Sequence, residues 1–156
     1  MRLWILRHGQ AAAQAASDAE RPLTSLGEAE VQAMSALLAG QPLDAILASP
    51  YRRAQQTAAV MRAELGFSQE VGTAPWLTPD DDPGEVLRFL SERSEQHVLL
   101  VSHQPLVSQL VSLLVEGNRA SHYPMPTAAL ACIELDFVAA GLGTLVALRV
   151  PADLAD

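Results

Sequence analysis

Short apolar runs alternate along the chain with longer segments whose apolar residues recur at helical spacing. Continuous apolar runs of this length are typical of buried strands. Four of them are predicted to be strands: residues 2–7, 44–48, 71–76 and 97–101. The intervening segments are predicted to be helices: residues 24–39, 49–66, 83–93 and a fourth helix that begins at Pro105. This alternation predicts parallel strands joined by helical crossovers.

Residue types that cap helices mark the ends of the first two. Thr24 is expected to be the N-cap of the first helix, and Gly40 to end it in a left-handed conformation. In the second helix, Ser49 is expected to be the N-cap with Pro50 at the first helical position, and Gly66 to close the helix. The second helix should therefore start directly after the second strand.

The C-terminal third has a different pattern. Residues 128–137 and 144–150 are strand-like runs joined by a glycine-containing segment, which predicts an antiparallel hairpin that covers a sheet edge or forms a contact. The predicted fold is α/β: a three-layer α/β/α sandwich with a mostly parallel central sheet and a C-terminal antiparallel hairpin. With 156 residues and no linker, a single domain over residues 1–156 is expected.

The composition indicates a compact protein and limits its partners. Hydrophobic residues make up 49% of the chain and charged residues 18%, which favours a packed core. The formal net charge of −8 is expected to repel nucleic acid and anionic membranes. Because no apolar stretch reaches membrane-spanning length and no signal-peptide pattern is present, a cytoplasmic protein is expected. The single cysteine, Cys132, is expected to be a buried small side chain.

Two of the predicted strands end in a histidine. Residues 3–6 lead into Arg7-His8-Gly9, and residues 98–101 lead into Ser102-His103. Ligands of open α/β sheets bind at the carboxyl ends of the strands, so two imidazoles there suggest chemistry on an anion such as a phosphoryl group. Because the chain has no lysine, the candidate cations are arginines: Arg7, Arg21, Arg52 and Arg53.

Two of these arginines lie in a third motif, residues 49–57, which follows a strand and opens a helix. The first turn of a helix presents free N–H groups and a positive dipole end to an anion. Consecutive helical residues point about 100° apart, so only one of Arg52 and Arg53 is expected to face the pocket. The alternative is an ordinary solvated helix start.

His8 is the candidate nucleophile. An unprotonated imidazole nitrogen can accept a phosphoryl group if an acceptor holds the other ring nitrogen. Gly9 is expected to let the backbone pass close to the ligand, and Arg7 to offer a fork of donors to phosphate oxygens. His103 is expected to donate to a phosphoryl oxygen as charge develops. Two histidines are too few for a typical zinc site and Cys132 has no partner at ligand spacing, so no metal or organic cofactor is expected.

Four motifs occur in the order found in the histidine phosphatase superfamily, the phosphoglycerate mutase-like proteins: Arg7-His8-Gly9, Leu23-Thr24-x-x-Gly27, Ser49-Pro50-x-x-Arg53-Ala54-x-Gln56-Thr57 and Ser102-His103. They span nearly the whole chain, which resembles this superfamily and is expected to share the phosphoglycerate mutase-like fold. The resemblance implies that His8 becomes phosphorylated. It further implies that Arg7, Arg53 and His103 form the phosphate pocket, and it selects Arg53 over Arg52.

Within the superfamily, the chain is most similar to the small phosphohistidine phosphatases of the SixA type. The similarity lies in the compact length and in three segments: residues 21–24, 77–79 and 102–107. It makes Arg21 a further candidate for the phosphate pocket. The alternative for Arg21 is a loop arginine paired with Asp18 or Glu20.

The chain departs from larger relatives, which carry a glutamate or aspartate general acid, often in an inserted segment. Asp80, Asp81 and Asp82 lie in the corresponding stretch, where both a solvated loop and a general acid are open interpretations. An imidazole leaving group, with a pKa of about 6.5, can take its proton from water, whereas an alkoxide needs a positioned acid far more. The missing acid therefore favours phosphohistidine, or an activated ester, over phosphoglycerate as the substrate.

Three functions fit these patterns. The favoured one is a phosphatase that acts on phosphohistidine of a phosphotransfer protein in a signalling relay, through an intermediate on His8. The second is a phosphatase of small phosphoesters or sugar phosphates, with mutase activity least favoured. The third, a non-catalytic phosphate-binding module, is disfavoured because all four pocket residues are present. His97 and His122 have no comparable context and are expected to be surface or packing residues.

Overall fold

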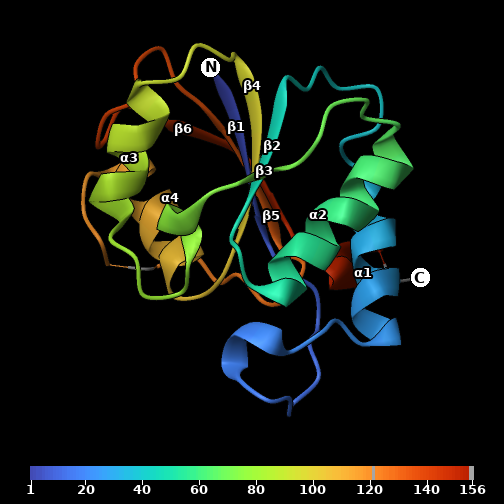
Figure 1. Ribbon diagram of the computed structural model, residues 1–156. Helices are drawn as coiled ribbons and strands as arrows, with labels where there is room; N and C mark the ends of the chain where they lie inside the picture. Colours follow the sequence, from blue (N-terminus) through green and yellow to red (C-terminus); the bar gives the residue numbers. More distant parts are fainter. Residues whose placement is uncertain (121, 155–156) are drawn as a thin grey trace.

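The computed structural model describes residues 1–120 and 122–154 (Figure 1). Within these residues the strands are β1 (Arg2–Arg7), β2 (Ala45–Ala48), β3 (Gly72–Thr73), β4 (His97–Ser102), β5 (Leu130–Glu134) and β6 (Thr144–Arg149). The α-helices are α1 (Ser25–Ser35), α2 (Arg52–Leu65), α3 (Pro83–Ser91) and α4 (Leu106–Glu116). Three short 3-10 helices complete the set: η1 (Asp18–Glu20), η2 (Pro75–Leu77) and η3 (Pro151–Leu154).

The strands form one sheet in the order β3-β2-β4-β1-β5-β6. β1 pairs in parallel with β4, β4 with β2, and β2 with β3. β5 pairs antiparallel with both β1 and β6. The predicted mostly parallel sheet with a C-terminal antiparallel hairpin is therefore confirmed.

Helices cover both faces of the sheet, and the alternation of side chains along β1 shows how. Leu3 and Ile5 pack into a core cluster with residues of α3 and α4, whereas Trp4 and Leu6 pack into a second cluster with residues of α1 and α2. Figure 1 shows the two helix pairs on opposite sides of the sheet. The fold is the predicted three-layer α/β/α sandwich. No helix in the described part of the chain is long and apolar enough to cross a membrane.

The first helix begins as predicted and ends earlier. Thr24 is its N-cap, and its hydroxyl accepts a hydrogen bond from the Gly27 N–H at 3.0 Å. The α-helix stops at Ser35 rather than near residue 39. From there the chain tightens into turns whose N–H groups bond three residues back, for example Leu38 to Ser35 at 3.0 Å. Gly40 then takes the predicted positive φ of 78°.

The prediction for the start of the second helix is wrong. α2 begins at Arg52 with Tyr51 as its N-cap, and neither Ser49 nor Pro50 is helical. The reason is that the Ser49 hydroxyl has other partners: it accepts from the Tyr51 N–H at 3.2 Å and bonds His103 at 2.7 Å. The C-terminal end is as predicted, with Gly66 in the left-handed conformation at φ 63°.

The predicted third strand is mostly not a strand. Only Gly72 and Thr73 pair with β2, and Pro75, which lacks an N–H to donate to a ladder, begins η2 instead. The other elements lie close to their predicted bounds: α3 begins at Pro83, α4 begins one residue after Pro105, and the hairpin strands are shorter than expected.

Candidate active site

The strand order brings three motifs of the sequence together. β1 and β4 are neighbours, and their register pairs Arg7 with Ser102, so His8 and His103 follow at the same level. The His8 N–H donates to the Ser102 carbonyl at 3.0 Å. On the other side of β4, the Ser49 N–H donates to the Val101 carbonyl at 3.0 Å. Residues far apart in the chain therefore meet at the carboxyl ends of adjacent parallel strands.

A cavity of about 380 Å³ opens at this edge of the sheet. Its lining consists of Arg7, His8, Gln10, Ala11, Asp18, Arg21, Arg53, Pro79, His103, Gln104 and Thr127. The five residues predicted from the sequence to form the pocket are among them: Arg7, His8, Arg21, Arg53 and His103. Arg53 is buried, whereas Arg52 is exposed and outside the lining, which agrees with the choice between them.

His8 has one ring nitrogen fixed and the other directed at an arginine. Its Nδ1 lies 2.7 Å from the Gly9 carbonyl oxygen, which can only accept, so Nδ1 carries the proton. Its Nε2 is therefore unprotonated, and the lone pair of Nε2 accepts a hydrogen bond from Arg53 Nε at 3.3 Å. Burial, reinforced by the nearby arginines, lowers the pKa of His8 to about 4. The imidazole is consequently neutral at physiological pH, with Nε2 available as a nucleophile.

His103 lies beside His8, with ring centroids 5.1 Å apart. Its Nε2 shares a 2.7 Å hydrogen bond with the Ser49 hydroxyl, and the Tyr51 ring packs against its ring at 5.0 Å. Burial, followed by the neighbouring His8, lowers the pKa of His103 to about 3, so this ring is also neutral. Its Nδ1 is buried and has no hydrogen-bond partner within residues 1–120 and 122–154.

The arginines leave donors directed into the cavity. Arg7 donates from Nη1 to the Met125 carbonyl at 3.0 Å, while its buried Nε has no partner in the described part of the chain. Partial burial and the nearby Arg53 lower the pKa of Arg7. Arg21 is held by the Ala12 carbonyl, which accepts from Nε at 2.7 Å. Clustered positive charge of this kind is stabilised by an anion with several oxygens.

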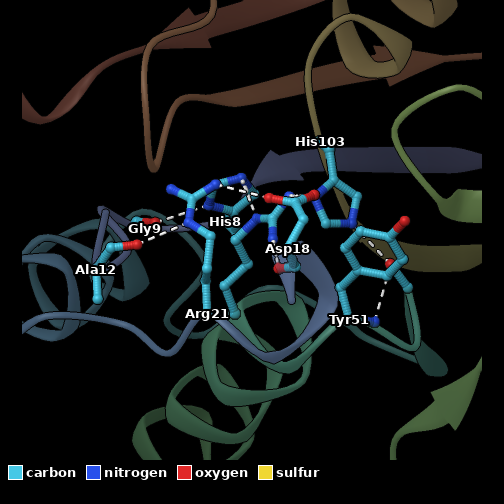
Figure 2. A network of polar contacts seen from close by, with 9 residues as sticks. His8, Gly9, Ala12, Asp18, Arg21, Tyr51 and His103 are labelled. Carbon is cyan, nitrogen blue, oxygen red and sulfur yellow. Dashed lines mark hydrogen bonds and ion pairs between the residues drawn. The ribbon is translucent and has the colours of Figure 1, made fainter. Parts of the chain in front are cut away.

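Asp18 is a site residue that the sequence reasoning missed (Figure 2). Its carboxylate accepts from Arg21 Nη1 at 2.8 Å and from Arg53 Nη2 at 3.2 Å, and its carbonyl accepts from Arg53 Nη1 at 2.7 Å. Hydrogen bonds from Arg21 and Arg53 hold the pKa of this carboxyl below its usual range. Asp18 was considered only as an alternative partner for Arg21. Arg21 lines the cavity and pairs with Asp18, so the predicted ion pair is present, while its binding of phosphate stays a prediction.

Gly9 is needed for packing, and its expected role in the close approach of a ligand stays a prediction. A Cβ on Gly9 would lie 2.6 Å from the Gly27 carbonyl oxygen, and one on Gly27 would lie 2.1 Å from the Gln10 oxygen. The two motif glycines therefore let the loop after β1 contact α1. On the opposite side, Thr57 accepts from the Gly9 N–H at 3.1 Å and donates to the Arg53 carbonyl at 2.8 Å, which ties this loop to α2.

The acidic loop has structural partners. Asp81 accepts from the N–H and hydroxyl of Thr78 at 2.8 and 2.6 Å. Asp82 caps α3 through the Gly84 N–H and pairs with Arg119 at 2.8 Å. The cavity lining includes neither of them. These contacts favour the loop interpretation of Asp81 and Asp82 over a general acid, and Asp80 is likewise outside the cavity lining.

The other two histidines and the cysteine lie away from the cavity. His97 pairs with Asp44 at 3.0 Å beside a second hollow of about 730 Å³ at the amino end of β1 and β4, and His122 pairs with Glu116 at 3.2 Å. Cys132 is buried in the core, and burial raises the pKa of its thiol. Within the described residues, no group of three or more His, Cys, Asp or Glu side chains is arranged to hold a metal ion.

The chain belongs to the histidine phosphatase superfamily. A sequence model of branch 1 of this superfamily matches residues 3–78. Phosphohistidine phosphatase SixA of Escherichia coli is 38% identical to this chain over 141 residues, which cover 87% of the chain and 86% of that protein. The SixA homolog of Haemophilus influenzae is 34% identical, with 83% and 87% covered.

A solved structure supports the same family. The protein histidine phosphatase SixA complexed with tungstate has a TM-score of 0.89 and 36% identity, covering 99% of this chain and 100% of that one. A more distant relative, the adenosylcobalamin/alpha-ribazole phosphatase of Escherichia coli, is 29% identical over 74% of this chain and 79% of its own. These comparisons confirm the predicted family, the phosphoglycerate mutase-like fold and the enzyme class.

Proposed function

We propose that the protein is a phosphohistidine phosphatase that acts on a phosphotransfer protein, with His8 as the nucleophile. The observation that carries the proposal is the state of His8: a neutral imidazole whose Nε2 lone pair meets Arg53 in a cavity lined by three arginines. An uncharged nucleophile within a cationic cavity suits attack on a phosphoryl dianion. The similarity to proteins named phosphohistidine phosphatase SixA supports the substrate class.

In the first step, His8 Nε2 attacks phosphorus and the P–N bond of the substrate breaks. Arg7 Nε has no partner in the described part of the chain, and Arg53 Nε loses its acceptor when His8 Nε2 bonds phosphorus. Both arginines then bind the phosphoryl oxygens and stabilise the charge that develops on them. His103 donates from Nδ1, the buried nitrogen that has no partner in the described part of the chain. In that tautomer the Ser49 hydroxyl donates to Nε2. Arg21 is a third cationic contact, and it pairs with Asp18 in the same cavity.

The second step transfers the phosphoryl group from His8 to water. The imidazole of His8 leaves readily, because Nδ1 already carries a proton and the departing Nε2 becomes neutral. The leaving imidazole of the substrate in the first step also needs no strong acid, since its pKa of about 6.5 lets water protonate it. Both steps are therefore accelerated mainly by positioning and by the fixed cations.

The test measures phosphate release from a phosphohistidine peptide by the wild-type protein and by the His8→Asn variant. The variant keeps a polar side chain and is expected to lose turnover, with a residual rate near that of solution. Arg52→Gln serves as the matched control, because Arg52 is exposed and outside the cavity. If His8→Asn retains the wild-type rate, the proposed mechanism is wrong.

A second candidate is a phosphatase of small phosphoesters. The 29% identity to an adenosylcobalamin/alpha-ribazole phosphatase favours it. A substrate panel at neutral pH separates the two candidates, since phosphohistidine and ribose or sugar phosphates differ in the acid that their leaving groups require. A higher kcat/KM for small esters than for phosphohistidine would establish the second function and overturn the first.

A further inference from the structure

We propose that Asp18 is the general base of the second step, in which its carboxylate accepts the proton of the water that attacks phosphorylated His8. The inference rests on the proposed function and adds a residue to it. Asp18 is an ionised side chain in the cavity, and among the described lining residues it is the one carboxylate. The first step does not require it, because the imidazole leaving group takes its proton from water.

In-line displacement decides where such a base has to lie. The attacking water approaches phosphorus from the side opposite His8 Nε2, which is the side that the leaving group of the first step occupied. His8 follows the carboxyl end of β1, at the edge of the sheet where the cavity opens. The loop that carries η1 projects beyond the strand ends there (Figure 1). Asp18 is the first residue of η1 and lines the cavity with an exposed side chain, so we infer that its carboxylate lies on the open side of the cavity.

Exposure separates Asp18 from the other available base, His103. The Asp18 side chain is 58% exposed, so water reaches its carboxylate directly. His103 is 1% exposed and lies alongside the His8 ring, next to the nucleophile rather than opposite it. Figure 2 shows Asp18 with Arg21, to which its carboxylate is bonded, and the two imidazoles that line the same cavity.

One guanidinium links the nucleophile to the proposed base. Arg53 directs Nε toward His8 Nε2 at 3.3 Å, and directs Nη1 and Nη2 to the Asp18 carbonyl and carboxylate. A phosphoryl group on Nε2 would contact the same guanidinium that holds the carboxylate. Arg21 binds the other carboxylate oxygen at 2.8 Å, which fixes the orientation of the group. The same two arginines keep Asp18 ionised and reduce its repulsion from the phosphoryl oxygens.

The hydrolysis of phosphorylated His8 needs no reactant other than water. In the phosphorylated enzyme, Nε2 carries the phosphoryl group and Nδ1 keeps its proton. The oxygen of water bonds to phosphorus while the P–Nε2 bond breaks, and the electron pair of that bond returns to Nε2. One proton of the water passes to Asp18, and the other stays on the product, hydrogen phosphate. Asp18 then releases its proton to the solvent.

The test follows the two steps separately in single turnover with radiolabelled phosphohistidine, using rapid quenching into base to preserve the label on His8. The Asp18→Asn variant keeps the backbone acceptor for Arg53 and the shape of the side chain. We expect it to become phosphorylated at close to the wild-type rate and to hydrolyse the label about 100-fold more slowly, so that phosphorylated His8 accumulates. Asp18→Glu keeps a carboxylate and is expected to hydrolyse faster than Asp18→Asn.

The control is Glu20→Gln, an exposed residue of the same 3-10 helix that lies outside the cavity lining. If Asp18→Asn hydrolyses the label as fast as Glu20→Gln, the inference is wrong. If Asp18→Asn slows both steps by the same factor, Asp18 acts only by positioning Arg53, and the inference is again wrong. If the wild-type protein never carries phosphate on His8, the proposed function itself fails.

Discussion

The neutral state of His8 is the electrostatic condition for its role, and it predicts how the protein responds to acid. The pKa of His8 falls from 6.5 to about 4, first because of burial and then because of the nearby arginines. In the unfolded chain the side chain is expected to return to about 6.5. As the pH falls below 6.5, the histidine of the unfolded chain therefore binds a proton, whereas folded His8 stays neutral. The folded state consequently loses stability relative to the unfolded state.

The size of this loss follows from the shift. A difference of about 2.5 pKa units, at 1.36 kcal/mol per unit, corresponds to about 3 kcal/mol once the pH is below 4. At pH 5, where folded His8 is still neutral and the unfolded histidine is almost fully charged, the loss amounts to about 2 kcal/mol. Well above pH 6.5 the histidine is neutral in both states, so this loss of stability is absent. Because the ring is only 6% exposed, screening by water reduces it little.

The substitution that isolates the effect of His8 on stability is His8→Asn, which removes the titrating group. Urea unfolding followed by circular dichroism gives the free energy of unfolding of both proteins at pH 7.5 and pH 5. We expect the wild-type protein to lose about 2 kcal/mol more than His8→Asn over this interval. Imidazole proton resonances, followed by NMR and assigned with the same variant, give the pKa directly. Equal losses in the two proteins, together with a His8 resonance that titrates near pH 6.5, would refute the reasoning.

Three further predictions concern residues that hold the site. Gly27→Ala places a Cβ 2.1 Å from the Gln10 oxygen, so urea unfolding should show a loss of about 1–3 kcal/mol, and an unchanged stability would contradict the contact. Thr57→Val leaves the buried Gly9 N–H without its acceptor and should cost about 1–3 kcal/mol, whereas Thr57→Ser should stay near wild type; equal losses would argue against the hydrogen bond. Asp81→Asn should keep kcat/KM for phosphohistidine within about twofold of wild type, whereas a general acid would cost about 100-fold.

Much of the site could be predicted because its signals are local. His8 and His103 each lie shortly after a continuous apolar run, and these two runs form β1 and β4 in the middle of the sheet. Parallel strands place their carboxyl ends at one edge of the sheet, so the sequence alone predicts that His8 and His103 lie at the same edge. The choice of Arg53 over Arg52 came from the resemblance and agrees with the burial of Arg53.

The errors arose where a partner lies far away in the sequence. Ser49 has the type and position of an N-cap, but its hydroxyl bonds His103, which is 54 residues away. The packing of Gly9 against Gly27 could not be predicted locally, because it depends on how α1 packs against the loop. Asp18 lies in an exposed loop without periodicity, so nothing local shows that its carboxylate joins two arginines at the cavity. The spacing Asp18-x-x-Arg21 was the signal available.

The central claim is that His8 accepts the phosphoryl group on Nε2, because Nδ1 carries the proton that the Gly9 carbonyl holds. The most direct test is phosphorus NMR of the protein denatured in base after rapid mixing with phosphohistidine, since the two ring-nitrogen isomers of phosphohistidine have different resonances. We expect the Nε2 isomer in the wild-type protein and no protein-bound phosphate in His8→Asn. Phosphate on Nδ1, or on any residue other than His8, would contradict the account.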